Sequence, residues 1–472
     1  MGEASRLVKN TAVIALGGSF TKLLQFFLLP LYTAVLTTAE YGTVDFVTVL
    51  VTFLVPISTL LIDESLFRFL IDCKTEFDSK KVVTTSLVVM GLGCAVIAVV
   101  VIPIVHVTRF EYGLWLVLYT YSTTALAVAS AVLRGFGKTA AYSLMNFIAG
   151  FLTIALNVVF IVALGWGVVG MLSASIIAQF SASVIFLMRA GLPSLVYLES
   201  FDKGMAGKMI KYSAPLIPTK VSWAVMNLSS RLVIMPVMGP SAAGLYALAY
   251  KFPSVMDMVF GFFFQSWKES SARVLSEGRE ATERFYLRVH SELQRVMASI
   301  VILMVPLMPF AFHLMVDKAY AGAIQYVPIL LLATYFSNMS GFVGGVFTAF
   351  MDTRVMGTST LVSAAVNLAL NVLLIPLLGL WGASISTLTA TFLVYAHRLI
   401  KVKKYVAFKY VSKTEIVCLL VFLIVGAFFY FGNSIAIAVA CLGSFVFAAV
   451  LNRRLILRSA GMMASRAKRK KR

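Results

Sequence analysis

The chain has 472 residues, of which 60% are hydrophobic and only 13% are charged, and its mean hydropathy is +0.92. A soluble protein of this length could not bury that much apolar surface, and soluble domains carry roughly twice this charge fraction. The net charge of +20 must therefore be placed relative to a membrane before it can suggest an acidic partner. Apolar runs long enough to cross a bilayer recur along the chain, whereas the short alternating segments of an outer-membrane barrel are missing. The sequence predicts an all-α polytopic membrane protein.

We predict about fourteen transmembrane helices. The first, at 10–36, follows Arg6 and Lys9 and is too long for a signal-peptide core, so we interpret it as a retained span. The others lie at 43–62, 82–105, 113–133, 142–164, 167–188, 212–238, 242–267, 296–316, 325–350, 357–378, 381–397, 414–431 and 433–451. Helices are expected because lipid offers the backbone no hydrogen-bond partners.

The distribution of Lys and Arg predicts the orientation. With the N-terminus inside, 34 of the 40 basic residues fall in cytoplasmic segments, two fall in outer loops and four lie within spans. This asymmetry favours fourteen spans over twelve or thirteen, with both termini cytoplasmic in the plasma (inner) membrane. The basic tail SRAKRKKR is then an inside anchor compatible with anionic head groups. No aromatic platform accompanies it, so we expect no nucleic-acid partner.

Three short strings occur twice in the same order. LNVVFIVALG (156–165) parallels LNVLLIPLLG (370–379), PLYTAVLTTAEYGTV (30–44) parallels PVMGPSAAGLY (236–246), and ESLFR (64–68) parallels ESSAR (269–273). The offsets, which run from 202 to 214 residues, predict two parallel six-helix repeats related by a pseudo-twofold axis along the membrane normal. The predicted organisation is an N-terminal lobe at 1–200, a C-terminal lobe at 201–405, two further spans at 406–452 and a basic tail at 453–472.

No catalytic or metal motif is present in the sequence. The four cysteines have no metal-ligand spacing, the four histidines are scattered, and no outer loop is long enough for a catalytic domain. We therefore expect neither an enzyme nor a cofactor, although coupling to a proton or sodium gradient stays open. Polar side chains within the spans must then carry the function.

The four basic residues within spans are Lys22, Lys220, Arg231 and Lys251. In the first span Ser19, Lys22 and Gln25 share a helical face, and Lys22 lies too deep to snorkel easily. In the seventh span Asn227 and Arg231 each lie within about 20° of Lys220 around the helix, so the three residues share one face. Snorkelling would account for Lys220 and Arg231 but not for Asn227. We interpret these residues as the lining of a cationic cavity suited to an anionic substrate, above all to phosphate oxygens.

The acidic residues near these cations have alternative roles. Asp257 lies six residues after Lys251, on a different helical face, and is a counter-ion for a neighbouring helix, a titrating group or a structural partner. Asp45 lies near the outer mouth in the second span and is a further candidate for coupling. At the inner ends of the two repeats, Glu64–Arg68 and Glu269–Arg273 are either interfacial salt bridges or a cytoplasmic gate.

Several longer strings point to a family. They are LLPLYTAVLTTAEYGTVDF (28–46), DESLFRFL (63–70), GLYALAYKFP (244–253) and the two repeated LNV strings. Through them the chain resembles the polysaccharide, or lipid-linked oligosaccharide, flippases of the multidrug/oligosaccharidyl-lipid/polysaccharide transporter superfamily, of the O-antigen transporter type. The resemblance covers nearly the whole chain. It implies a fourteen-helix fold of two lobes that moves an undecaprenyl-diphosphate-linked oligosaccharide from the inner to the outer face of the membrane.

The resemblance also implies partners and one departure. Membrane lipids and polysaccharide polymerase or assembly proteins are the partners expected of such a flippase. Many relatives have an Asp just before the Arg of the seventh span, where this chain has Ser230. The adjacent residue therefore offers Arg231 no carboxylate, which favours a substrate anion. Two alternatives are a multidrug cation antiporter, which would favour carboxylates in the spans, and an integral-membrane glycosyltransferase or glycan polymerase, which would need a large outer loop.

Overall fold

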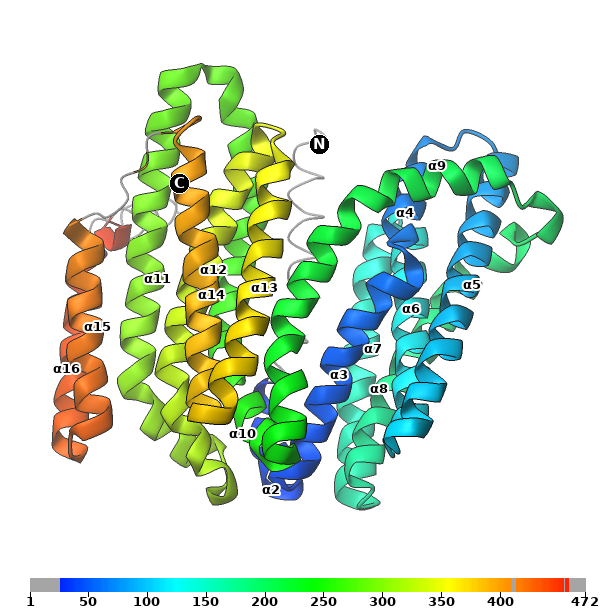
Figure 1. Cartoon of the computed structure of the whole chain (residues 1–472). Coiled ribbons are helices and arrows are strands. Elements are labelled where there is room, and N and C mark those ends of the chain that lie inside the picture. The colour runs from blue at the N-terminus through cyan, green and yellow to red at the C-terminus, as the bar shows by residue number, and fades with distance from the viewer. Residues whose placement is uncertain (1–25, 407, 409–412, 454, 458–472) are drawn as a thin grey trace, which may run out of the picture. The chain divides into compact units, whose positions relative to one another are not determined.

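The computed structural model describes residues 26–406, 408, 413–453 and 455–457, and of Glu269, Thr353 and Lys413 only the backbone. These residues fold into helices and connecting turns without any strand, which confirms the predicted all-α class. The chain divides into two compact units, Met1–Ala247 and Leu248–Arg472. Figure 1 shows the helices of both units.

Unit 1 consists of helices joined by short turns. They are α2 (Leu29–Val35), α3 (Thr38–Thr59), α4 (Ile62–Asp72), α5 (Glu76–Thr108), α6 (Gly113–Gly135), α7 (Thr139–Asn157), the π-helix η1 (Val158–Ala163), α8 (Gly167–Arg189), the 3₁₀ turns η2 (Leu192–Leu195) and η3 (Leu198–Ser200), α9 (Lys203–Ser213), η4 (Ala214–Leu216) and the first part of α10 (Ile217–Val274). α3 packs on α5 and α6, and α8 packs on both α6 and α7.

The ends of the helices in unit 1 follow from local sequence. Thr37 and Glu40 form a reciprocal capping box at the start of α3, and Thr75 caps α5 through the Asp78 N–H. α10 is interrupted at Gly239, whose φ of 84° is a conformation that glycine adopts without a steric penalty. This break lies at the predicted junction between the seventh and eighth spans.

One of the hydrophobic clusters in the core of unit 1 is built on the apolar face of α3. Val47 and Val51 are buried in one cluster with Val117 of α6 and Leu172 of α8. Lipid tails are as apolar as these side chains, so the cluster stabilises the unit through close packing more than through removal from water. This packing fixes the polar residues that α3 also carries.

Unit 2 begins within α10 at Leu248. It continues through η5 (Leu275–Glu277), α11 (Arg279–Met315), η6 (Lys318–Tyr326), α12 (Val327–Ala349), α13 (Thr353–Leu378), α14 (Leu380–Val402), α15 (Lys413–Phe431) and α16 (Ser434–Leu451). α14 packs on α12 and α13, while α11 packs on α12, α15 and α16. Asn433 caps α16 by accepting from the Ala436 N–H, at the predicted turn between the last two spans.

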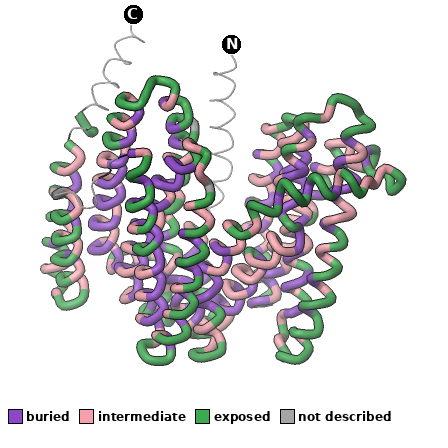
Figure 2. The backbone as a smooth tube through the Cα atoms, turned by 45° about the horizontal axis from the view of Figure 1, so that its top comes forward, coloured by how far each residue is buried: buried purple, intermediate pink, exposed green. Residues whose placement is uncertain are grey.

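The last two helices contribute little to the core of unit 2. Only 11% of the most apolar stretch of α15, and likewise of α16, is buried, and both lie at the edge of the unit (Figures 1 and 2). Their exposed side chains are long aliphatic and aromatic groups such as Leu423, Ile435 and Leu442. Such surfaces are stable only against lipid or another apolar surface.

Eleven segments of the described chain are long and apolar enough to cross a membrane. One of them, Lys203–Glu277, contains two of the predicted spans, and most of the predicted span at 10–36 lies outside the described residues. The chain is a multi-pass membrane protein, while the count of fourteen stays a prediction. The predicted lobe boundary at 200/201 also stays a prediction, since the compact units divide at 247/248.

Candidate functional site

Two glycines bring α3 and α10 into backbone contact. A Cβ atom on Gly42 would lie 2.1 Å from the Pro240 carbonyl oxygen, and one on Gly244 would lie 1.9 Å from the Thr38 carbonyl oxygen. No larger residue fits either position. Small residues at helix interfaces in membranes allow the two backbones to approach this closely. The crossing positions Asp45, one turn after Gly42, and Tyr246, two residues after Gly244.

Arg231 lies at this crossing and is paired with Asp45. Its Nε donates to Asp45 Oδ2 at 3.0 Å, and its Nη1 donates to the Asn227 carbonyl oxygen at 3.2 Å. The guanidinium carbon lies 5.1 Å from the centre of the Tyr246 ring. The two charged side chains are 7% and 16% exposed, and Tyr246 is fully buried. This is a largely desolvated ion pair with an aromatic ring on one side.

The structure thus supplies the carboxylate that the sequence neighbour of Arg231 lacks. Ser230 offers no carboxylate, as the sequence indicates, but Arg231 is nevertheless paired because Asp45 approaches from α3. The sequence indicates both residues as candidates but does not indicate that they pair. Their separation of 186 positions leaves no local pattern that would reveal the pair.

The predicted stripe on α10 is not uniformly accessible. Lys220 and Asn227 are exposed, whereas Arg231 is only 6% exposed. Lys22 and Gln25 lie outside the described residues. Lys251 and Asp257, in the part of α10 that belongs to unit 2, are both exposed. The assignment of these residues to a substrate cavity therefore stays a prediction.

The predicted inner end of unit 1 has a different charge arrangement from the expected one. Glu64 Oε1 lies 3.6 Å from Lys220 Nζ, and Arg68 Nη1 donates to Asp72 Oδ1 at 2.8 Å. The expected Glu64–Arg68 salt bridge was therefore wrong, because each residue has another partner. Burial raises the pKa of the neighbouring Asp63, and the charge of Glu64 raises it further.

The matching pair in the second repeat is only partly described. Arg273 is exposed, and the side chain of Glu269 lies outside the described residues. The gate formed by Glu64, Arg68, Glu269 and Arg273 stays a prediction, with Lys220 now added on the side of unit 1.

Unit 2 contains a buried arginine that sequence analysis placed in a cytoplasmic segment. Arg398 on α14 is 1% exposed and donates to Ser359 Oγ, Thr360 Oγ1 and both oxygens of Ser340 at 2.9–3.2 Å. These acceptors are neutral and come from α12 and α13. The guanidinium therefore joins three helices through hydrogen bonds, and its role is structural.

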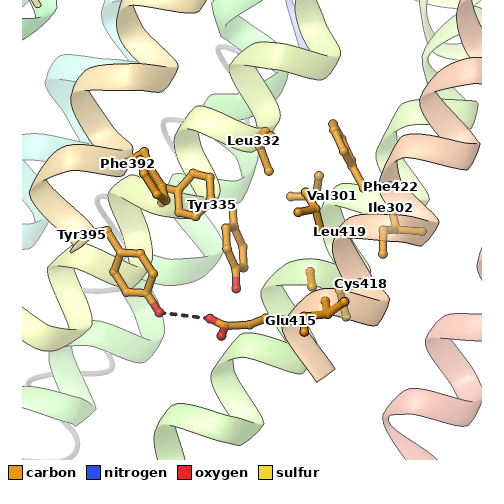
Figure 3. A pocket seen from close by; sticks show the side chains of 13 residues that line it. Val301, Ile302, Leu332, Tyr335, Phe392, Tyr395, Glu415, Cys418, Leu419 and Phe422 are labelled. Carbon is orange, nitrogen blue, oxygen red and sulfur yellow. Dashed lines mark hydrogen bonds between the residues drawn. The ribbon is translucent and has the colours of Figure 1, made fainter. Parts of the chain in front are cut away.

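An apolar groove in unit 2 has a carboxylate at one end. The groove contains about 750 Å³ of empty space and is lined by α11, α12, α14 and α15 (Figure 3). Tyr395 donates to Glu415 Oε1 at 3.3 Å, and Gln294 donates to the same oxygen. The three residues come from three helices, so their spacing in the sequence does not predict that Tyr395, Gln294 and Glu415 form a cluster.

A comparison with family models matches residues 7–267 to the family described as "Polysaccharide biosynthesis protein". The comparison with curated protein sequences gave no match.

Solved structures with the same fold include transporters of two kinds. The structure titled "Lipid II flippase MurJ, inward closed conformation" superposes with a TM-score of 0.73 at 14% identity, over 94% of this chain and 100% of that one. An inward-facing multidrug resistance MATE family transporter of the MOP superfamily gives 0.69 at 14% identity, over 83% of this chain and 97% of that one. A MOP superfamily transporter from Pyrococcus furiosus, whose title reports a "reverse polarity of binding pocket", gives 0.58 at 14% identity, over 84% and 94%. These similarities establish the fold.

Proposed function

The chain belongs to the polysaccharide biosynthesis protein family and is a membrane transporter, and we propose that its substrate is an undecaprenyl-diphosphate-linked oligosaccharide. It moves this polysaccharide repeat unit from the cytoplasmic to the outer leaflet of the plasma (inner) membrane by alternating access, with both termini cytoplasmic. A relative in fold, with a TM-score of 0.73, is titled a lipid II flippase. The observation that carries the proposal, beyond the family, is the desolvated arginine at the crossing of α3 and α10.

Arg231 suits the diphosphate for two physical reasons. Its guanidinium is always charged and presents planar donors that match phosphate oxygens. Its surroundings also exclude most water, so an approaching anion is attracted more strongly than it would be at a surface. A diphosphate carries more negative charge than the single carboxylate of Asp45, and it competes with that carboxylate for the guanidinium.

Asp45 then has a defined role in the cycle. It holds Arg231 in place when no substrate is bound and is displaced when the diphosphate arrives. Exchange of one anion for another avoids leaving a charge desolvated and unpaired, which would cost several kcal/mol. Protonation of the released carboxylate offers a route to proton coupling; sodium coupling is the alternative.

The remaining predicted residues extend the cationic path. Lys22, Gln25, Lys220, Asn227 and Lys251 contact the head group in successive positions, and Asp257 acts as a counter-ion. The polyprenyl tail stays in the bilayer among membrane lipids. The released unit passes to a polysaccharide polymerase or assembly protein, and the chain itself performs no chemical step.

A multidrug cation antiporter is the second candidate because transporters of that type share the fold. Its site would favour carboxylates within the spans. Here Asp45 and Arg231 neutralise each other, and the predicted spans carry three further cations against two further carboxylates, Asp257 and Glu415. The charge balance therefore favours an anionic substrate. A glycosyltransferase or polymerase is disfavoured by the family and by the transporter fold.

The test replaces Arg231 by Gln in a strain that depends on this chain for its surface polysaccharide. The lipid-linked glycan reaching the outer leaflet is measured by accessibility to an impermeant glycosidase, at matched membrane levels of protein. We expect outer-leaflet glycan to fall at least about tenfold, the factor that corresponds to one lost charge-assisted contact. Unchanged transport in this variant would overturn the role of Arg231, and drug efflux without a glycan defect in a deletion strain would favour the antiporter.

A further inference from the structure

A second cavity in unit 2 lies between the first half of α11 and the end of α16. It contains about 670 Å³ of empty space and is lined by Arg288, Ser291, Glu292, Arg295, Leu451, Asn452 and Leu455. It is separate from the Arg231–Asp45 site, whose residues belong to unit 1. Two guanidinium groups that line the same cavity favour the binding of an anion.

The two arginines share one face of α11. They lie seven residues apart, so they are within about 20° of each other around the helix, with Ser291 and Glu292 on the turn between them. Arg295 Nε is buried and has no hydrogen-bond partner among the described residues. A buried donor without a partner is costly, and an N–H of a charged group more so than a neutral one. An acceptor inside the cavity would remove this cost.

The wall formed by α16 is fixed against α11. Asn452, just past the end of α16, donates from its Nδ2 to Ser299 Oγ on α11 at 2.8 Å. It also donates to the Ala448 carbonyl oxygen at 2.9 Å, which satisfies the end of its own helix. The cavity is therefore a built feature of the α11–α16 contact rather than a gap between loosely placed helices.

The position of the cavity indicates which anion it takes. α16 is apolar and mostly exposed, as expected of a helix that faces lipid. The cavity lies where this helix ends, and its lining combines the apolar Leu451 and Leu455 with the two arginines. A ligand that fits has a phosphate next to hydrocarbon, which is the chemistry of a phospholipid at the membrane interface.

The charge of the lining favours a headgroup with net negative charge. Two arginines and Glu292 leave the lining with one net positive charge, which a single phosphodiester neutralises. A zwitterionic headgroup would bring an extra cation into the same space. We propose that this cavity is a binding site for the phosphate of an anionic phospholipid, with Arg295 as the inner contact and Arg288 as the outer one.

The experiment uses the purified full-length protein in detergent, with bound lipid counted by native mass spectrometry. The protein is titrated separately with phosphatidylglycerol, phosphatidylcholine and inorganic phosphate. The variants are Arg295→Gln and Arg288→Gln. The matched control is Arg279→Gln, which removes the same charge from an exposed position on the same helix outside the cavity.

We expect phosphatidylglycerol to bind the unmodified protein and the Arg279→Gln control equally, and the Arg295→Gln variant about tenfold more weakly. Arg288→Gln is expected to weaken phosphatidylglycerol binding less than Arg295→Gln does. Because Arg288 is exposed, this variant stays folded and still tests the site if the Arg295→Gln protein is lost from the membrane. Equal binding by all four proteins would overturn the site. Phosphatidylcholine binding as tightly as phosphatidylglycerol, or inorganic phosphate blocking the site at the same concentration as lipid, would overturn the assignment to an anionic phospholipid.

Discussion

Arg231 and Asp45 lie 186 residues apart in sequence and 3.0 Å apart in space. The pair exists because Gly42 and Gly244 let α3 and α10 touch backbone to backbone. A guanidinium that is costly in lipid thereby gains a carboxylate, a backbone carbonyl and an aromatic face from within one unit. It is also the group that the proposed substrate would engage.

The Arg231–Asp45 pair is expected to behave as a coupled unit in stability. Asp45→Asn or Arg231→Met alone should lower the free energy of unfolding by about 3–5 kcal/mol, because each leaves a desolvated charge without its partner. The double variant should lose much less free energy of unfolding than the sum of the losses in the two single variants. Unfolding in mild detergent, analysed as a double-mutant cycle, measures the coupling; additive losses would contradict a direct pair.

Gly42→Val and Gly244→Val are expected to separate α3 from α10. A Cβ at either position would overlap backbone atoms, which cannot move aside as a side chain does. We expect loss of folded protein from the membrane, measured by fluorescence-detected size-exclusion chromatography. Gly91→Ala on α5 is the matched control, because an added Cβ meets nothing within 4 Å there. A monodisperse, fully active Gly42→Val protein would contradict the crossing.

Arg398 is expected to be a structural residue that lysine cannot replace. Lysine is a point charge and cannot reach Ser340, Ser359 and Thr360 together. Arg398→Lys should therefore destabilise the protein by at least about 2 kcal/mol, and Arg398→Ala by more. Lys401→Gln, at an exposed position on the same helix, should have little effect. Thermal unfolding of the three variants distinguishes these outcomes.

Asp202 is expected to make stability depend on pH at the acidic end. Its carboxylate accepts from Lys81 and from the Met205 N–H, and these contacts hold its pKa below the ordinary value. A carboxyl group with a depressed pKa stabilises the folded state above its unfolded pKa of about 3.9. That stabilisation is lost as the pH falls through the lower, folded pKa.

Asp202→Asn isolates this charge effect, since asparagine still caps α9. The melting temperature of the variant should lie below that of the unmodified protein at pH 6 and approach it below about pH 4. A difference that does not change with pH would mean that the cap, and not the charge, provides the stability.

The sequence by itself determined the class of the protein. The long apolar runs and the one-sided distribution of Lys and Arg depend only on composition and order, and they suffice to predict helices in a membrane. Breaks at Gly239 and Asn433 were also local, since glycine geometry and helix caps act within a few residues. Several longer strings carried the family resemblance, which the match over residues 7–267 confirms.

The tertiary structure decided which charges meet. Asp45 on α3 pairs with Arg231, Glu64 pairs with Lys220 rather than with Arg68, and Arg398 is buried among three helices. Helical spacing predicts which residues share a face, but it does not say which other helix that face contacts. That depends on close packing between segments far apart in the chain, because a charge in a low-dielectric interior is stabilised by whichever partner the packing brings within hydrogen-bond distance.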